Sequence, residues 1–262
     1  MIGAAGRMGK RICELVSTSE ALRLAGATER PDFPRLGETL RQALGSVAAN
    51  VKLVGRLDEI SDPFDVIIDF TFPAISMETV RFASRTKKAA VIGSTGFSGD
   101  EMEEIKKLSR AFPCVWAPNM SVGVNTLFKL VREVALILGD EFDAEVVEAH
   151  HRTKKDAPSG TALKIAQILA QAYGRDLTQV GVYQRKGFIG ERTKEEIGIQ
   201  TIRGGDIVGD HTVLFCGPGE RLELIHRAHS RDTFAHGALR AALWVIDKPN
   251  GLYDMQDVLG LK

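Results

Sequence analysis

Short apolar runs alternate with segments of helical periodicity over residues 1–121, and this alternation limits the possible folds more than any other feature of the chain. Buried strands are expected for the apolar runs at residues 22–29, 65–70, 89–95 and 114–119. Helices are expected for the segments between them, at residues 9–19, 74–88 and 100–112. Strands that alternate with helices predict a parallel sheet covered by helices on both faces, which is an α/β fold.

The pattern changes after residue 121. Two long helices are expected at 124–139 and 159–174, with a strand at 143–151 between them, and Ser159 or Thr161 is expected near the N-cap of the second helix. Three further strands are expected at 197–205, 207–217 and 220–230, and a helix at 233–248. Successive strands joined by glycine-rich turns predict hairpins and a more antiparallel sheet.

The composition excludes several classes of function. The 34 Lys and Arg residues balance the 34 Asp and Glu residues, so the zero net charge gives no support for nucleic-acid binding. Cys13, Cys114 and Cys216 show no CxxC spacing, which argues for reduced thiols and against a disulfide framework or a zinc site. No apolar run approaches the roughly 20 residues of a membrane span. We therefore expect a cytoplasmic protein that has no bound metal and binds neither nucleic acid nor membrane.

A glycine-rich stretch, GAAGRMG, opens the chain at residues 3–9. Such a loop between a strand and a helix lets the backbone approach a pyrophosphate, although Ala5 replaces the second glycine of the usual GxGxxG pattern and a simple helix-capping turn is the alternative. Glu29 and Arg30 follow at the end of the next expected strand. An acid there suits the ribose of NAD and an arginine suits the 2′-phosphate of NADP, so the pair is compatible with either cofactor.

The central first strand of such a sheet is expected to be nearly absent. Only Met1 and Ile2 precede Gly3, whereas a strand of about five residues is usual. Either these residues lie upstream, or the chain is truncated, or another segment supplies the strand. A chain with this opening is expected to bind cofactor weakly or to be unstable.

The stretch EAHHRTKKDAPSGTA, at residues 148–162, collects cationic groups directly before a helix start. Its cationic or ionisable residues are His150, His151, Arg152, Lys154 and Lys155. The free amides and the dipole of the following helix favour an anion, so cations and helix start together suit a carboxylate ligand, and a dianion would use both. A solvated basic loop is the alternative. Metal binding is disfavoured because adjacent histidines point to opposite sides of a strand and no third ligand has suitable spacing.

A dinucleotide domain followed by a dianion site indicates hydride transfer to a small acid, with His and Lys as possible proton donors. Two other readings remain open. The first is another two-domain nicotinamide oxidoreductase: a semialdehyde dehydrogenase would need a nucleophilic cysteine on a site loop, but Cys114 and Cys216 lie in expected strands, and a sugar dehydrogenase would not need a dense cation cluster. A dinucleotide sensor without turnover would have little use for His150 and Lys154.

The chain resembles the dihydrodipicolinate reductase (4-hydroxy-tetrahydrodipicolinate reductase) family almost from end to end. The motifs that carry the resemblance are GAAGRMG (3–9), DFTFP (69–73), VIGSTGF (91–97), NMSVGVN (119–125), EAHHRTKKDAPSGTA (148–162), RGGDIVGDHTVLF (203–215), GERLELIHRAHSRDTFAHGALRAALW (219–244) and GLYDMQDVL (251–259). The departures are the short first strand and GST at 93–95, where the family usually has GTT.

The resemblance implies a Rossmann-like dinucleotide domain at 1–121 and 231–262, to which the C-terminal helix returns, and an α+β domain with a mixed sheet at 122–230. The second domain would bind substrate and assemble a homotetramer, and closure would occur over hinges near residues 121 and 231. NADH or NADPH would reduce the cyclic dicarboxylate 4-hydroxy-tetrahydrodipicolinate with loss of water, in the diaminopimelate route of lysine biosynthesis.

The resemblance also implies roles for individual residues. The expected pyrophosphate loop is Gly3, Ala4, Ala5, Gly6, Arg7 and Met8, with Glu29 at the adenosine ribose and Arg30 at the 2′-phosphate. The expected nicotinamide side is Gly93, Ser94, Thr95, Ala117, Pro118, Asn119 and Met120. His150 would be a proton donor and acceptor and Lys154 a proton donor, while His151, Gly160 and Thr161 would bind the substrate carboxylates with help from Ser159. Structural roles are expected for His211, His226, His229 and His236.

Overall fold

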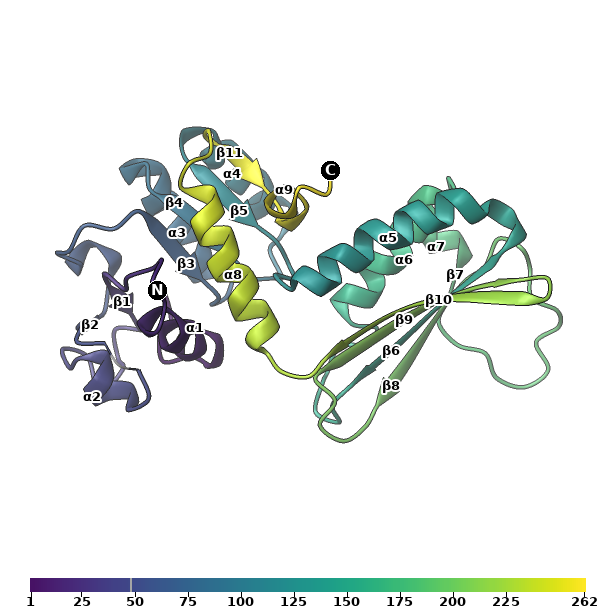
Figure 1. Ribbon diagram of the computed structural model, residues 1–262, viewed down its shortest axis with the longest axis horizontal. Helices are drawn as coiled ribbons and strands as arrows, with labels where there is room; N and C mark the ends of the chain where they lie inside the picture. Colours follow the sequence, from purple (N-terminus) through teal and green to yellow (C-terminus); the bar gives the residue numbers. More distant parts are fainter. Residues whose placement is uncertain (48) are drawn as a thin grey trace. The chain divides into compact units, whose positions relative to one another are not determined.

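The computed structural model describes residues 1–47 and 49–262 (Figure 1). The chain divides into two compact units, the first formed by Met1–Val122 with Asp232–Lys262 and the second by Gly123–Arg231. Within the described ranges, no helix is long and apolar enough to cross a membrane.

The first unit is built on a parallel sheet. Its strands are β1 (Ala27–Thr28), β2 (Leu53–Val54), β3 (Val66–Asp69), β4 (Ala89–Ile92), β5 (Pro113–Trp116) and β11 (Gly251–Tyr253). Its helices are α1 (Arg7–Ser17), α2 (Leu40–Leu44), α3 (Pro73–Thr86), α4 (Gly99–Leu108), α8 (Asp232–Val245) and α9 (Met255–Leu259), with short 3-10 turns at Leu57–Glu59 and Ser109–Ala111. The pairs β1–β2, β3–β4, β4–β5 and β5–β11 are all parallel.

A single residue takes the place of the central strand in this sheet. Ile2 forms parallel bridges to both Thr28 and Asp69, and its amide donates to the Ile68 carbonyl at 3.0 Å. The Thr28 amide donates to the Met1 carbonyl at 2.9 Å. The resulting order, β2-β1-Ile2-β3-β4-β5-β11, is that of a Rossmann sheet. The prediction of a nearly absent first strand is therefore confirmed.

The strand expected over residues 22–29 is much shorter than predicted. Only Ala27 and Thr28 have strand pairing, and the Met1 ammonium donates to the Gly26 carbonyl just before them. Residues 22–25 lack a neighbouring strand among the described residues, so their apolar character alone does not make them extended sheet.

Helices cover both faces of the parallel sheet. Alternate strand residues point to opposite faces, so Ile68 and Val91 pack with α1, α8 and α9, whereas Ile67, Ala90 and Ile92 pack with α3 and α4. The long α8 returns from the end of the second unit to lie across this sheet (Figure 1). Burial on both faces explains why these strands read as continuous apolar runs.

The second unit carries a mixed sheet. Its strands are β6 (Asp143–His150), β7 (Gly181–Val182), β8 (Ile197–Arg203), β9 (Gly209–Gly217) and β10 (Glu220–Ala228), and its helices are α5 (Val122–Leu138), α6 (Gly160–Ala172) and α7 (Leu177–Val180), with a 3-10 turn at Gly139–Glu141. The order is β10-β9-β6-β8-β7, in which β6 and β7 run parallel to β8 while β9 is antiparallel to β6 and β10. The α/β class with one parallel and one mixed sheet is confirmed.

The prediction that the strands after residue 197 form successive hairpins is only half right. The strands β9 and β10 form a hairpin, but β8 and β9 do not pair because β6 lies between them. The order depends on pairing between segments that are far apart in the chain, which local sequence does not reveal.

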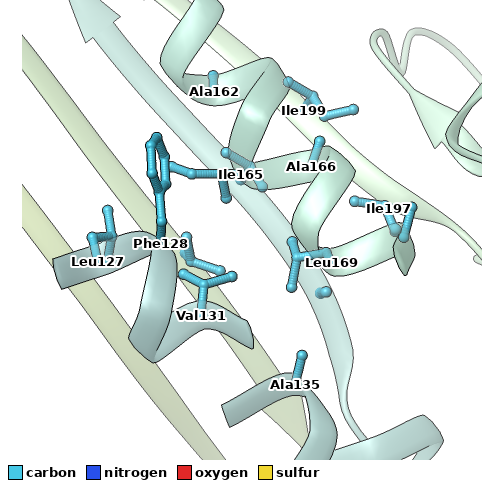
Figure 2. Packing of buried hydrophobic residues seen from close by; sticks show 14 of the residues in the cluster. Leu127, Phe128, Val131, Ala135, Ala162, Ile165, Ala166, Leu169, Ile197 and Ile199 are labelled. Atoms are coloured by element: carbon cyan, nitrogen blue, oxygen red, sulfur yellow. The ribbon is translucent and has the colours of Figure 1, made fainter. Parts of the chain in front are cut away.

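One apolar core lies between the mixed sheet and the helices α5 and α6 (Figure 2). It brings together Phe128 and Val131 of α5, Ile165 and Leu169 of α6, and Ile199 of the sheet. On β6 every second residue faces this core, from Ala144 and Val146 onward. The same alternation continues to Glu148 and His150, so these two polar side chains lie at the edge of the apolar core.

Candidate active site

The loop before α1 is shaped by glycines. Gly3 has a φ of +64°, a conformation that favours glycine. A Cβ added to Gly9 would lie 2.0 Å from the Gly3 carbonyl oxygen, so the first turn of α1 packs directly on the loop backbone. Gly6 is the N-cap and, within the described residues, no side chain caps α1, which leaves the amides at its start for a ligand. Gly6 and Arg7 are exposed there, while Ala4 is buried.

Glu29 connects this loop to the end of β1. Its carboxylate accepts hydrogen bonds from the amide of Ala5 at 2.9 Å and from the amide of Arg30 at 3.2 Å. The Arg30 side chain is exposed and pairs with Asp32 at 3.2 Å. The structure therefore places the acid beside the glycine loop and the arginine at the surface next to it.

The residues of the turn after β4 differ in how exposed their side chains are. Ser94 is buried, accepts a hydrogen bond from Ser76 Oγ at 2.7 Å and donates to Asp69 Oδ1 at 3.5 Å. Its side chain therefore faces the interior of the first unit, whereas Thr95 is exposed. A Cβ on Gly93 would lie 2.3 Å from the Phe70 ring, so a larger residue there would require the ring to move.

Two buried side chains anchor the segment after β5. Ala117 and Met120 are buried, Pro118 is exposed, and Asn119 Oδ1 accepts the amide of Ser121 at 2.9 Å. The loop at 3–8, Glu29 and the turns after β4 and β5 all follow the carboxyl ends of parallel strands, where nucleotides bind in such sheets.

In the second unit the cationic stretch forms a turn between β6 and α6. His150, the last residue of β6, is buried, whereas His151 is half-buried and its Nδ1 lies 2.8 Å from Thr153 Oγ1. Lys154 pairs with Asp156 at 2.9 Å and is also largely covered. His150, His151 and Lys154 are therefore at least partly covered, whereas Arg152 and Lys155 are exposed.

Ser159 starts α6 in the way the sequence predicts. Its hydroxyl accepts the amide of Ala162 at 3.2 Å, and its own amide donates to Glu148 Oε1 at 3.0 Å. Gly160 is exposed and Thr161 half-buried in the first turn. The helix start and the side chains of His151 and Lys154 therefore belong to one turn, as an anion site requires.

A buried ion pair supports this turn from beneath. Glu148 is fully buried and receives both terminal nitrogens of the Arg203 guanidinium, at 2.9 Å each, while His150 Nδ1 lies 2.5 Å from Glu148 Oε2. Burial alone raises the pKa of Glu148, but Arg203, His150 and the Ser159 amide outweigh it, so the pKa lies below its ordinary value. Burial, together with the charges of Lys154 and Arg203, lowers the pKa of His150 below its ordinary value although Glu148 raises it.

His211 joins the site although the sequence indicates a structural role for it. Its ring lies 5.2 Å from that of His150, edge to face, and its Nε2 lies 3.2 Å from Ser159 Oγ. Burial, with the nearby His150, lowers the pKa of His211 to about 3, so the ring is neutral at physiological pH. Its Nδ1 is buried with no hydrogen-bond partner among the described residues.

Glu148, Arg203 and His211 are members of the site that sequence patterns did not identify. Only Glu148 carried a local signal, because it shares the inner face of β6 with His150 at a spacing of two residues. Strand pairing places Arg203 opposite His150 and His211 opposite Glu148. Among the residues that the structure describes, no group of three or more His, Cys, Asp or Glu side chains could hold a metal ion.

Comparison with known proteins gives the same assignment for both units. The family model for the N-terminus of dihydrodipicolinate reductase matches residues 1–120, and the model for its C-terminus matches residues 123–259. The chain belongs to the dihydrodipicolinate reductase family. A relative from Syntrophobacter fumaroxidans, named 4-hydroxy-tetrahydrodipicolinate reductase, is 55% identical over 260 residues, which are 99% of this chain and 97% of the relative. One of the same name from Geobacter sulfurreducens is 52% identical over 261 residues, with the same coverage of both chains.

Solved structures agree with this family membership. A dihydrodipicolinate reductase from Paenisporosarcina sp. TG-14, described as dipicolinate-bound, has a TM-score of 0.75 and 25% identity, covering 98% of this chain and 96% of its own. A myo-inositol 2-dehydrogenase from Lactobacillus plantarum has a TM-score of 0.59 at 11% identity, covering 99% and 92% of the two chains, and this likeness shows a shared fold only. As a member of the dihydrodipicolinate reductase family, the chain is an oxidoreductase with a fold that binds pyridine nucleotides.

Proposed function

We propose that this protein catalyses the NAD(P)H-dependent reduction of 4-hydroxy-tetrahydrodipicolinate to tetrahydrodipicolinate in the diaminopimelate route of lysine biosynthesis. The reaction consumes one hydride and one proton and releases water. The observation that carries the proposal is the second-unit turn, in which buried His150, covered Lys154 and the start of α6 come together. Family membership and the Rossmann order of the first unit supply the rest of the argument.

The first unit fits a dinucleotide. The first turn of α1 packs directly on the loop backbone, and the segment Gly3–Met8 would hold the pyrophosphate at the start of this helix, which no described side chain caps. Glu29 would accept hydrogen bonds from the ribose, and exposed Arg30 would contact a 2′-phosphate. The bound nicotinamide would supply the hydride. Because the acid and the arginine are adjacent, we propose that the protein uses both NADH and NADPH.

The second unit fits a cyclic dicarboxylate. The amides of Gly160 and Thr161 would bind one carboxylate at the dipole of α6, with His151 and the Ser159 hydroxyl beside them. Lys154 and His150 would move the proton, since they are the covered ionisable groups of the turn. The dipicolinate named in the Paenisporosarcina structure is a molecule of this class, which supports the proposal.

We further propose a homotetramer in the cytoplasm. The face of the mixed sheet that lies opposite α5 and α6 carries Ile202, which is 51% exposed, and Ile225, which is 48% exposed. Exposed apolar residues on an open sheet face suit contact with another copy. Sedimentation at equilibrium tests this assembly, and a monomer at micromolar concentration would contradict it.

The thiol-dependent alternative has no support in the structure. Burial raises the pKa of Cys114 to about 12, so its thiol stays protonated and cannot act as a nucleophile at physiological pH. Burial likewise raises the pKa of Cys13 to about 11.

The deciding experiment follows the absorbance of NADH or NADPH while the preceding synthase makes the substrate from pyruvate and aspartate semialdehyde. We expect oxidation that depends on the synthase and on both of its substrates. Cofactor binding without oxidation would instead identify a dinucleotide sensor. No binding would contradict the assignment of the glycine loop.

A further inference from the structure

Glu148 contacts more of the second-unit site than any residue assigned a role above. It is fully buried, and its two carboxylate oxygens face different partners. Oε1 accepts the amide of Ser159 at 3.0 Å, the hydroxyl of Thr201 at 3.3 Å and one nitrogen of Arg203 at 2.9 Å. Oε2 faces His150 Nδ1 at 2.5 Å and accepts the other Arg203 nitrogen at 2.9 Å. One carboxylate thus joins the candidate proton carrier to the helix start that would bind substrate.

The contact with Glu148 determines where His150 carries its proton. An ionised carboxylate can only accept hydrogen bonds, so the ring nitrogen that faces it must be the N–H donor. That nitrogen is Nδ1, and in the neutral ring Nε2 is then the free acceptor. In the structure Nε2 lies beside Gly209, where an added Cβ would come within 3.0 Å of it, so a side chain at this position would crowd the atom.

We infer that Glu148 is a positioning residue that keeps the proton of neutral His150 on Nδ1 and so presents Nε2 as the atom that exchanges a proton with the substrate. The inference rests on the proposed function and names the atom through which His150 would act. Because Glu148 also accepts the amide of Ser159, it fixes the distance between this histidine and the start of α6.

The charges around His150 are compatible with this role. Glu148 faces it from β6, Arg203 from β8, neutral His211 from β9, and Lys154, itself paired with Asp156, from the turn. Arg203 keeps Glu148 ionised even though it is buried. Of these groups, Glu148 is the one that favours the protonated form of His150.

The test variant is Glu148→Gln, which keeps the shape of the side chain and removes its charge. The site of Oε2 faces fewer donors than the site of Oε1, so the amide NH₂ is expected to take the place of Oε2. There it would donate to His150 Nδ1 and drive the ring proton to Nε2. We expect kcat to fall by at least about tenfold, with the KM for NADPH unchanged. The limb of the pH–rate profile that reports His150 is expected to move to lower pH, because the charge of Glu148 no longer favours the protonated ring.

The matched control is Glu145→Gln. Glu145 lies on the same strand but on its opposite face, and it also receives two nitrogens of one arginine, Arg185, at 2.8 and 2.9 Å. If Glu148 were merely structural, both variants would lower the melting temperature and leave the pH–rate profile in place. We expect the profile to move in Glu148→Gln alone.

A measurement without substrate separates this inference from the proposed function. Nitrogen-15 NMR of labelled histidine distinguishes the two neutral tautomers, and the His150→Asn variant identifies the His150 signals. We expect wild-type His150 to carry its proton on Nδ1 near neutral pH. A wild-type ring protonated on Nε2 would overturn the inference whether or not Glu148→Gln folds. The expected tautomer with no reductase activity would contradict the proposed function and leave Glu148 as the residue that orients His150.

Discussion

The two candidate binding regions depend on different parts of the polypeptide: the backbone in the first unit and side chains in the second. The nucleotide loop of the first unit depends on backbone, because Gly3 and Gly9 allow an approach that any side chain would block. The anion turn of the second unit depends on side chains, because Glu148 holds His150 and Ser159 from beneath. A region made of backbone is sensitive to added atoms, whereas a region made of paired side chains is sensitive to lost charge.

The largest expected effect is in the side-chain region. Lys154→Ala should lower kcat by about 10²–10⁴-fold, the usual contribution of a general acid, while the affinity for NADPH stays the same. Steady-state rates and a fluorescence titration of NADPH measure the two quantities. Lys155→Ala, which changes the exposed neighbour, is the control and should behave like the wild type. Unchanged turnover in Lys154→Ala would remove this lysine from the mechanism.

The second test adds one carbon atom, the Cβ of alanine, next to the glycine loop of the first unit. Gly9→Ala places a Cβ 2.0 Å from the Gly3 carbonyl oxygen, so the loop must shift. We expect weaker binding of both cofactors and a loss of roughly 1–3 kcal/mol in the free energy of unfolding. Gly99→Ala is the control, because that glycine starts α4 with open space around it. Wild-type cofactor affinity in Gly9→Ala would mean that the loop does not bind the pyrophosphate.

Cofactor choice gives a smaller effect. Arg30→Ala should weaken the binding of NADPH by roughly tenfold and leave the binding of NADH nearly unaffected. Only NADPH has a 2′-phosphate that could accept the hydrogen bond from the guanidinium. Dissociation constants for the two cofactors are the measurement, and NADH serves as the internal control. Equal weakening of both would show that Arg30 does not contact the phosphate.

The smallest effect concerns stability. His211 has a pKa of about 3 in the folded state against an ordinary value of 6.5, so the unfolded chain takes up its proton first. Its contribution is fully present above pH 6.5 and is lost as pH falls toward 3, by about 1 kcal/mol between pH 7 and 5.5. Urea denaturation at the two pH values measures this loss. It should shrink in His211→Asn but not in His229→Asn, which changes an exposed histidine.

The same contrast explains what the sequence could predict. The glycine loop, the parallel strands and the N-cap at Ser159 are local patterns, and the structure has each of them. The central position of β6 is set by strand pairing, so neither the interruption between β8 and β9 nor the place of Arg203 could be inferred from neighbouring residues.

Side-chain direction was equally hidden from the sequence. Ser94 lies in the turn that the family resemblance assigns to the nicotinamide, yet its hydroxyl is committed to Asp69 and Ser76. Those partners come from other segments, and only the fold brings them within reach. His211 is the opposite case, because an apparently ordinary strand residue enters the site through its register with Glu148.

The small core that includes Leu40 and Leu53 has a consequence for how the first unit opens. This core belongs to the segment of β1, β2 and α2 and also includes Ala4 and Cys13, while Thr28 of the segment forms backbone hydrogen bonds with Met1 and Ala4. Segments with few buried contacts to the rest of a protein open as separate cooperative units in native-state hydrogen exchange. The amides of this segment should therefore exchange at a lower free energy than those of β3, β4 and β5. A bound nucleotide that contacts both Glu29 and the glycine loop would couple this segment to the rest of the first unit and slow that exchange.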